Sequence, residues 1–295
     1  MKIAIRNYER TDESQLLDLF PYEKDLVYLL RSSNITCVYL SVVRDEIVGI
    51  IIAWTNQFHP YCTYFRILIV PFCRQKNIES TLFNMLLRNK KVEYPLQTSI
   101  LETSSNLKSF YKENGFTEIR RTHLPRLKIK ELSSKQFNFE VKGIQTLSEI
   151  SKDRQLMEKL TILVKDVYEE THVDNPVAKL SLHDWEQLIM ADDIMMDGSL
   201  IYLDANEVSI LAYSFLHYAE DNETLELGWC GSVSQYIHLL PQLVLSQIVY
   251  ANKLKFQFIT GEFDTTSKYA MKVLQNIPFP TSDAWITYQK SYVTE

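Results

Sequence analysis

The chain has 295 residues, a length that favours two domains of roughly 130–150 residues over a single core. Its apolar fraction of 46% and charged fraction of 23% are ordinary for a globular protein and exclude a low-complexity or disordered chain. The formal net charge of −6 excludes a non-specific nucleic-acid binder, because proteins that bind polyanions concentrate Lys and Arg.

The four cysteines are scattered along the chain without a Cys-x-x-Cys pair or a dense framework. This spacing favours a reducing cytoplasm over a secreted, disulfide-bonded scaffold. The N-terminus places charges where a signal peptide has its apolar stretch. The longest apolar run, at residues 47–54, is far too short to span a membrane. We therefore expect a cytoplasmic protein with no membrane partner.

The first half of the chain alternates β-rich runs with amphipathic helical segments. Thr11-Asp12-Glu13-Ser14 is a signal for the start of a helix, and Asn114-Gly115 is a signal for the end of one. In chain order, the expected elements are a strand at 2–6, a helix after Thr11, a helix at 23–31, a hairpin of strands at 37–43 and 47–55, a strand at 62–70, a helix at 79–88, a strand at 98–101, and a helix at 106–113 followed by extended chain from Phe116.

The second half repeats this order of elements. Its expected elements are a strand at 137–143, helices at 153–170 and 182–190, a hairpin of strands at 200–203 and 208–218, a strand at 224–230, a helix at 236–251, a strand at 256–260, a helix at 267–275 and a strand from 279. Val38 and Ile201 are separated by 163 residues, as are Phe116 and Phe279. A repeat that keeps its register over this length indicates a duplicated domain, with the boundary in the polar stretch 131–136.

The segment 67–82 joins a strand to a helix through a loop that carries Arg74 and Lys76. The N-terminus of a helix presents unpaired N–H groups and the positive end of the helix dipole, which suits a pyrophosphate. Ser80 and Thr81 add hydroxyl groups that can also contact a phosphate. Glu79 would repel a phosphate unless its side chain turned away, and an ordinary capped junction of loop and helix explains these residues equally well.

The segment 106–116 has Tyr111 four residues before the pair Gly115-Phe116. Together with the loop at 67–82, it resembles the corresponding motifs of the GNAT acyltransferase superfamily, whose loop reads Gln/Arg-x-x-Gly-x-Gly/Ala. Arg74 matches the first position of that loop, whereas Asn77 and Glu79 stand where glycine and glycine or alanine are usual. Asn tolerates left-handed backbone geometry, so the first departure is mild. The resemblance is motif-specific over 67–82 and 104–116 and extends by element order over nearly the whole chain.

The resemblance implies an α/β (α+β) fold of two tandem GNAT-like domains, each a mixed, mostly antiparallel twisted sheet flanked by helices. It places a GNAT acyltransferase domain at 1–132 and a degenerate GNAT-like domain at 133–295. It also implies acetyl-CoA as cosubstrate and transfer of its acetyl group to a primary amine. The residues that would bind acetyl-CoA are Ile69 and Val70 through the main chain, and Arg74, Gln75, Lys76, Asn77, Ile78, Ser80 and Thr81 in the loop and first helical turn.

The resemblance further implies that Tyr111 is the general acid that protonates the CoA thiolate. The alternative is a half-buried aromatic residue on a helix, with a packing role alone. Glu102, at the end of the fifth strand, is the candidate general base, and a solvent-facing carboxylate at a strand end is its alternative. His59 and Cys62 form a His-x-x-Cys pair that could line the acceptor pocket. No second pair completes a metal site, so we expect no metal.

The second half lacks the corresponding groups. Leu274 takes the position of Tyr111, and residues 233–243 contain no Lys or Arg. Glu262 and Asp264 form its acidic pair, which capping of the last helix by Asp264 explains.

Three functions therefore stay open. The first is an N-acetyltransferase, and the second is a non-catalytic pseudo-acyltransferase that binds acyl-CoA or a partner protein. The third is a ligand pocket in the second half built from Trp229, His238 and Trp285. The sequence decides neither the acceptor amine nor whether the protein forms a homodimer.

Overall fold

The computed structural model describes residues 3–73, 77–131 and 143–292, which divide into two compact units. Unit 1 is drawn from Met1–Ile119, Asn175–Ala178 and Ile286–Glu295, and unit 2 from Arg120–Asp174 and Lys179–Trp285. The boundary expected between 132 and 133 lies outside the described residues, as does the strand expected at 137–143 apart from Gly143. None of the helices that the structure describes is long and apolar enough to cross a membrane.

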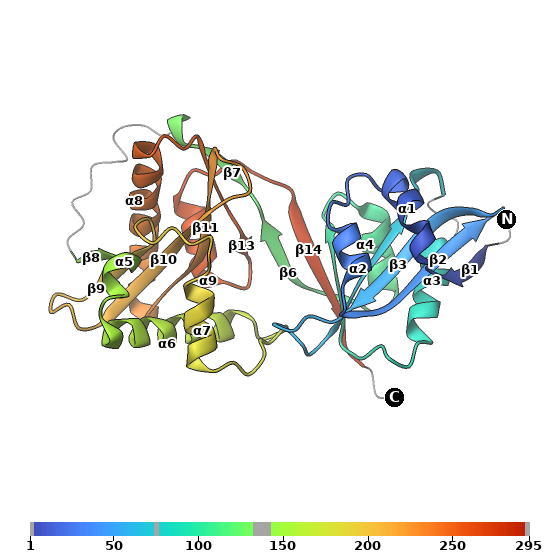
Figure 1. Cartoon of the computed structure of the whole chain (residues 1–295), viewed down its shortest axis with the longest axis horizontal. Coiled ribbons are helices and arrows are strands. Elements are labelled where there is room, and N and C mark those ends of the chain that lie inside the picture. The colour runs from blue at the N-terminus through green and yellow to red at the C-terminus, as the bar shows by residue number, and fades with distance from the viewer. Residues whose placement is uncertain (1–2, 74–76, 132–142, 293–295) are drawn as a thin grey trace. The chain divides into compact units, whose positions relative to one another are not determined.

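Unit 1 is built on a sheet with the strand order β1-β2-β3-β4-β5-β14-β6, in which β6 contributes up to Ile119 and β14 from Ile286. Figure 1 labels β1, β2, β3, β6 and β14 of this sheet. The strands are β1 (Ala4–Asn7), β2 (Ile35–Val43), β3 (Glu46–Trp54), β4 (Thr63–Ile69), β5 (Leu96–Leu101), β6 (Thr117–His123) and β14 (Ala284–Lys290). Neighbouring strands from β1 to β4 are antiparallel, whereas β4 and β5 are parallel. The hairpin expected at 37–55 is confirmed, and both residues of its turn, Arg44 and Asp45, have positive φ.

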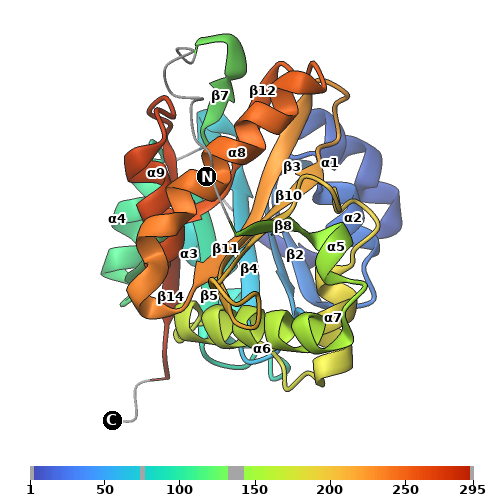
Figure 2. The ribbon, with the colours of Figure 1, turned by 90° about the vertical axis from the view of Figure 1, so that its left-hand side faces the viewer.

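Helices cover both faces of this sheet. They are η1 (Arg10–Asp12), α1 (Glu13–Leu19), α2 (Leu26–Arg31), η2 (Pro71–Cys73), α3 (Ile78–Leu87) and α4 (Ser105–Glu113). Successive side chains of a strand point to opposite faces. Arg66 of β4 points to the connection between α1 and α2, where it pairs with Asp25 at 2.8 Å. Phe65 points to α3, where its ring lies 5.8 Å from that of Phe83. Helices α1 and α2 therefore lie on one face of the sheet and α3 and α4 on the other, as Figure 2 shows.

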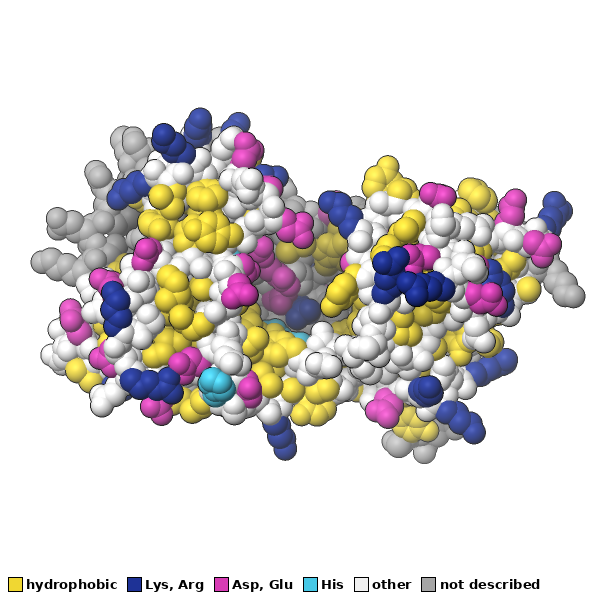
Figure 3. Space-filling model, in the orientation of Figure 1, with side chains coloured by type: hydrophobic (Ala, Val, Ile, Leu, Met, Phe, Trp, Pro, Cys, Tyr) yellow, Lys and Arg dark blue, Asp and Glu magenta, His cyan; other side chains and the backbone are white. Residues whose placement is uncertain are grey.

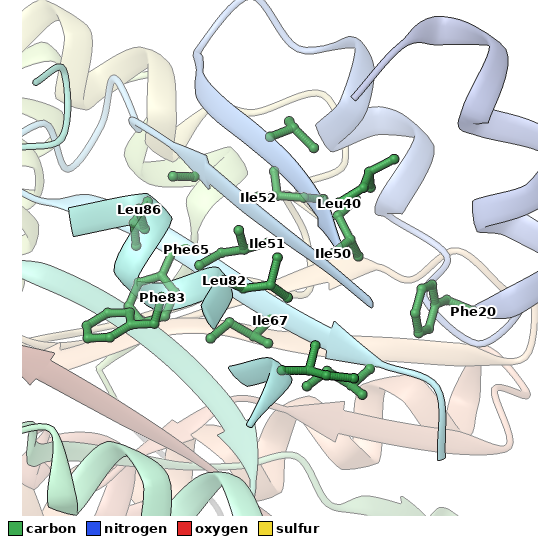
Figure 4. Close-up of a cluster of buried hydrophobic side chains, with 14 of the residues drawn as sticks. Phe20, Leu40, Ile50, Ile51, Ile52, Phe65, Ile67, Leu82, Phe83 and Leu86 are labelled. Carbon is green, nitrogen blue, oxygen red and sulfur yellow. The ribbon is translucent and has the colours of Figure 1, made fainter. Parts of the chain in front are cut away.

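The core of unit 1 fixes α3 on the sheet. Ile67 of β4 packs in the same buried cluster as Leu82 and Phe83 of α3, and each of the three is at most 3% exposed (Figure 4). Burial of a side chain of this size contributes roughly 1.5–3 kcal/mol relative to exposure. The end of β4 and the start of α3 are thus held at a defined separation.

The C-terminal strand completes this core. Ile286 and Tyr288 of β14 are buried in the same cluster as the side chains of α3. Thr287, on the other face, has its hydroxyl 2.9 Å from that of Ser99 in β5. The strand expected from 279 begins only at Ala284, because the prolines before it cannot donate to a strand ladder.

Unit 2 has a sheet with the strand order β7-β12-β11-β10-β9-β8. Its strands are β7 (Arg126–Lys128), β8 (Ile144–Thr146), β9 (Leu200–Leu203), β10 (Ile210–Tyr218), β11 (Thr224–Ser232) and β12 (Phe258–Gly261), and the short β13 (Phe263–Asp264) pairs with the end of β6. Only β11 and β12 are parallel among its neighbouring strands. Each unit therefore has a mixed, mostly antiparallel sheet, as expected.

Helices also flank the sheet of unit 2. They are η3 (Ile129–Glu131), α5 (Leu147–Ile150), α6 (Arg154–Thr171), α7 (Leu182–Ile189), η5 (Ser234–Leu239), α8 (Leu240–Lys253) and α9 (Lys268–Asn276). The helix expected at 236–251 starts as the 3-10 helix η5, and the α-helix α8 begins at Leu240. Pro241 lies in the first turn of α8, where its missing N–H costs no helical hydrogen bond.

Candidate active site

Strands β4 and β5 of unit 1 pair only at their first residues. Their parallel pairing ends at Tyr64↔Gln97, whereas β4 stays paired with β3 up to Ile69. The Val70 N–H donates to the Val48 carbonyl at 3.1 Å, so by alternation the N–H and C=O groups of Ile69 point to the side of β5. Because the pairing with β5 has already ended, this main-chain edge can receive an extended ligand.

Helix α3 follows β4 in the chain after the 3-10 helix η2. Asn77, its N-cap, adopts the left-handed conformation with φ 57°, which asparagine tolerates. Ile78 is buried and Ser80 is exposed in the first turn. The remaining loop residues expected at the cofactor lie outside the described residues, namely Arg74, Gln75 and Lys76.

Two of the residues expected at the cofactor use their hydrogen-bonding groups within the chain. Besides its N–H bond to Val48, Val70 accepts from the Cys73 N–H at 2.9 Å. The Thr81 hydroxyl donates to the Asn77 carbonyl at 2.8 Å. Both residues therefore have little left to offer a phosphate or a pantetheine amide.

Glu79 lies in the first turn of α3 and is half-buried. Burial raises the pKa of Tyr111, and the negative charge of Glu79 adds to this effect. A carboxylate at a helix N-terminus interacts favourably with the helix dipole. Glu79 thus supplies at this position the negative charge that a bound phosphate would otherwise bring.

Tyr111 lies in α4 and is completely buried. Its ring packs against four aromatic rings at centroid distances between 5.2 and 5.9 Å, those of Phe65, Phe110, Phe116 and Tyr288. Gly115, just after α4, has φ +77°, which ends the helix and turns the chain towards Phe116. The ring of Tyr111 is therefore held firmly, with Phe65 of β4 as one of its walls.

The hydroxyl of Tyr111 forms no hydrogen bond with any residue that the structure describes, and the same holds for the Thr98 hydroxyl. Burial raises the pKa of Tyr111 far above its ordinary value, an effect that the Thr98 hydroxyl partly offsets. The phenol is therefore neutral at physiological pH and can act as a proton donor. Thr98 was not among the residues expected at the site, although a threonine between Leu96 and Ile100 on one face of a strand was an available signal.

Glu102, the expected general base, directly follows β5 and is half-buried. It lies at the end of the strand that parts from β4, and Tyr111 lies in the helix that follows. The two residues therefore come from adjacent elements of unit 1.

His59 and Cys62 are brought together in unit 1 by a distant residue, Asn175. The His59 Nδ1 atom lies 2.8 Å from the Asn175 carbonyl oxygen, and the Cys62 thiol lies 3.5 Å from the Asn175 side-chain oxygen. The Asn175 amide also donates to the Tyr64 hydroxyl at 2.9 Å. Because Asn175 is buried, these contacts give the His-x-x-Cys pair a structural explanation that the sequence did not reveal.

In unit 2, Asp264 is held by basic and hydroxyl groups. Arg120 Nη1 lies 3.2 Å from Asp264 Oδ2, and the Thr122 hydroxyl donates to the same carboxylate. Asp264 does not cap α9, contrary to expectation, because the N-cap of that helix is Ser267. Burial and the nearby Asp264 raise the pKa of Glu262.

Trp229 of β11 packs against rings of α6 and α7. Its ring lies 4.9 Å from that of Tyr168 and 6.0 Å from that of Trp185. The pocket expected from the sequence combined Trp229 with His238 and Trp285. His238 lies in η5, and Trp285 lies at the start of β14. The contacts of Trp229 with Tyr168 and Trp185 were therefore not predicted from the sequence.

The face of the protein that Figure 3 presents carries mixed charges. On this face, Lys and Arg side chains are interspersed with Asp and Glu side chains. Such interspersion is typical of an ordinary solvated surface.

The chain is similar over its length to several solved structures. A GCN5-related N-acetyltransferase from Sphaerobacter thermophilus has a TM-score of 0.66 and 11% identity, with 98% of this chain and 95% of that chain covered. A tandem GNAT protein from the clavulanic acid biosynthesis pathway has a TM-score of 0.60 and 13% identity, with 98% of each chain covered. A GNAT-family acetyltransferase from Colwellia psychrerythraea has a TM-score of 0.56 and 11% identity, with 98% and 99% covered. The sequence matches no protein-family model and no curated protein. At these identities the likeness concerns the fold.

Proposed function

Because the chain has the tandem GNAT fold, we propose that it is an acyltransferase whose unit 1 transfers an acetyl group from acetyl-CoA to a primary amine. The observation that carries this proposal is the buried hydroxyl of Tyr111, which has no hydrogen-bond partner among the described residues. Buried polar groups are almost always paired. An unpaired proton donor packed against β4 therefore favours a role toward a substrate atom over a role in packing alone.

In this proposal the open edge at Ile69 pairs with the pantetheine arm of acetyl-CoA, and the N-terminus of α3 faces its pyrophosphate. The residues proposed to contact the phosphates are Arg74, Gln75, Lys76, Asn77, Ile78 and Ser80. Val70 and Thr81 would contribute by packing, since their hydrogen-bonding groups are already used.

The proposed reaction is a direct transfer. The amine nitrogen attacks the thioester carbonyl carbon, so that an N–C bond forms and the C–S bond breaks as the tetrahedral intermediate collapses. Tyr111 gives its phenolic proton to the departing sulfur. The nitrogen loses one proton, which Glu102 accepts. Glu102 then releases this proton to water, and water returns a proton to Tyr111.

The test is the release of CoA thiol by the whole chain, measured with acetyl-CoA and a panel of amines: a polyamine, an amino sugar, amino acids and a peptide. We expect Tyr111→Phe to lower kcat by roughly 10²–10⁴-fold while the Kd of acetyl-CoA stays unchanged, because general acid catalysis contributes about that much. Tyr288→Phe is the matched control, since it removes another buried phenol hydroxyl from the same aromatic cluster.

Two outcomes would contradict this role. Wild-type turnover in Tyr111→Phe would remove Tyr111 from the mechanism. Equal losses in Tyr111→Phe and Tyr288→Phe would assign the effect to the packing of the aromatic cluster.

We also propose a cytoplasmic location. All four cysteines are free thiols. Burial raises the pKa of Cys37 to about 11 and that of Cys230 to about 12, which disfavours the reactive thiolate. Reduced and unreactive thiols suit a reducing compartment.

Glu79 favours a second candidate function, a pseudo-acyltransferase that binds acyl-CoA or a partner protein without catalysis. A half-buried carboxylate in the first turn of α3 opposes a phosphate at that site. Calorimetric titration with acetyl-CoA separates the candidates. Binding without thiol release over the amine panel would favour the acyl-CoA-binding module, and no binding at millimolar ligand would leave the protein-interaction module.

A further inference from the structure

Thr98 is a polar residue on the apolar face of β5. Its neighbours on that face, Leu96 and Ile100, belong to the core of unit 1, and Thr98 itself is 3% exposed. Ser99, on the other face of the strand, has its hydroxyl paired with that of Thr287. The Thr98 hydroxyl forms no hydrogen bond with any described residue. Valine would fill the same volume without an unsatisfied hydroxyl, so packing does not explain the threonine.

The Tyr111 hydroxyl is likewise buried without a partner among the described residues. Four aromatic rings pack around the Tyr111 ring and restrict its movement. Leu96 and Ile100, which flank Thr98 on this face of β5, belong to the same buried cluster as Tyr111, so Thr98 faces the core in which the phenol lies. Burial raises the pKa of Tyr111, and the Thr98 hydroxyl partly offsets this effect. Two hydroxyls, one from β5 and one from α4, therefore lie close together in the core, each with unused hydrogen-bonding capacity.

We propose that Thr98 is a positioning residue for Tyr111, and that its hydroxyl donates a hydrogen bond to the phenol oxygen as the phenolic proton leaves for the sulfur. This inference rests on the proposed function. Negative charge develops on the phenol oxygen in that step, and burial of the ring shields this charge from stabilisation by bulk solvent. The Thr98 donor supplies this stabilisation from inside the core, and the neutral phenol is restored when a proton returns from water.

The variants Thr98→Val and Thr98→Ser test the role of this hydroxyl, since valine removes it and serine keeps it. We expect Thr98→Val to lower kcat roughly tenfold, as for loss of a hydrogen bond to a charged group. The KM for acetyl-CoA should change less than about twofold, and Thr98→Ser should retain most of the activity. The solvent deuterium isotope effect on kcat should increase in Thr98→Val, because proton transfer becomes slower. Its melting temperature should equal or exceed that of the wild type, because an unsatisfied buried hydroxyl has been replaced by a methyl group.

The double variant Thr98→Val/Tyr111→Phe decides whether Thr98 acts through Tyr111. We expect it to be no slower than Tyr111→Phe alone, because residues that act as a unit are not additive. An equal loss in both backgrounds would overturn the proposal, as would wild-type kcat in Thr98→Val.

Stability separates this role from a structural one. A lower melting temperature of Thr98→Val, with activity lost in proportion to folded protein, would also overturn the proposal. A wild-type chain without turnover on any amine would instead refute the proposed function, and the role of Thr98 would fall with it.

Discussion

Replacement of Glu79 by Gln should tighten the binding of acetyl-CoA. Glu79 lies in the first turn of α3, and its charge already reaches Tyr111. A phosphate at this helix N-terminus would lie within about one turn, on the order of 6 Å from the carboxylate. With an effective dielectric constant between about 40 and 80, two unit charges at that distance repel by roughly 0.7–1.4 kcal/mol. Loss of the carboxylate should therefore lower the Kd by about 3–10-fold for each phosphate charge that it faces.

Calorimetric titration of both proteins at low and at high salt measures this effect. The difference should shrink at high salt, because ions screen the repulsion. Glu93→Gln is the matched control, since Glu93 is exposed and lies beyond the C-terminal end of α3, which is about 15 Å long. The reasoning would be refuted by a Kd of Glu79→Gln within twofold of wild type, or by an equal gain in Glu93→Gln.

Two further predictions concern the stability of unit 1. Asn175→Ala should lower the free energy of unfolding by about 1–3 kcal/mol, because it removes the buried amide that bonds Tyr64, and an unchanged denaturant midpoint would contradict this. Asp12→Asn should lower the free energy of unfolding by about 1–2 kcal/mol at pH 7, because the largely buried Asp12 carboxylate pairs with the Arg6 guanidinium at 2.7 Å. This pairing holds the pKa of the Asp12 carboxyl below its ordinary value. A carboxyl whose pKa is lower in the folded than in the unfolded protein contributes stability above its unfolded pKa of about 3.9 and loses this contribution as pH falls through the folded pKa. The difference in free energy of unfolding between variant and wild type should therefore shrink from about pH 4 downwards. Equal differences at about pH 7 and pH 3 would count against the pair.

Local signals in the sequence were enough to predict the hairpin of β2 and β3 and the end of α4. Arg44 and Asp45 mark a turn between two β-rich runs, and the hairpin follows from neighbours in the chain. The helix that carries Tyr111 ends at Asn114 and Gly115, as that pair predicts. These features depend on residues that lie within one turn or one hairpin of each other, so periodicity and capping identify them.

The contacts that complete the candidate site were not predictable in this way. Tyr288 and Tyr111 are far apart in the chain, and the alternation of β14 would suit several edges of a sheet. The same limit hid the contact of Asn175 with Cys62. Thr98 was missed for another reason. Its alternation with Leu96 and Ile100 was visible in the sequence, but threonine is common in strands. Only the structure shows that its hydroxyl is buried without a partner among the described residues.

The contribution of β14 also decides how the proposed function has to be tested. A fragment that ends at residue 132 would lack Ile286 and Tyr288, two buried side chains whose loss would remove roughly 3–6 kcal/mol of burial from unit 1. It would also lack Lys290, whose ammonium group donates to the Asn114 carbonyl at the end of α4 at 2.7 Å. Loss of activity in that fragment would therefore report a damaged core around Tyr111 and would say nothing about where the chemistry lies. The roles of Tyr111 and Glu79 can be decided only by single substitutions in the whole chain, each beside its matched control, Tyr288→Phe or Glu93→Gln.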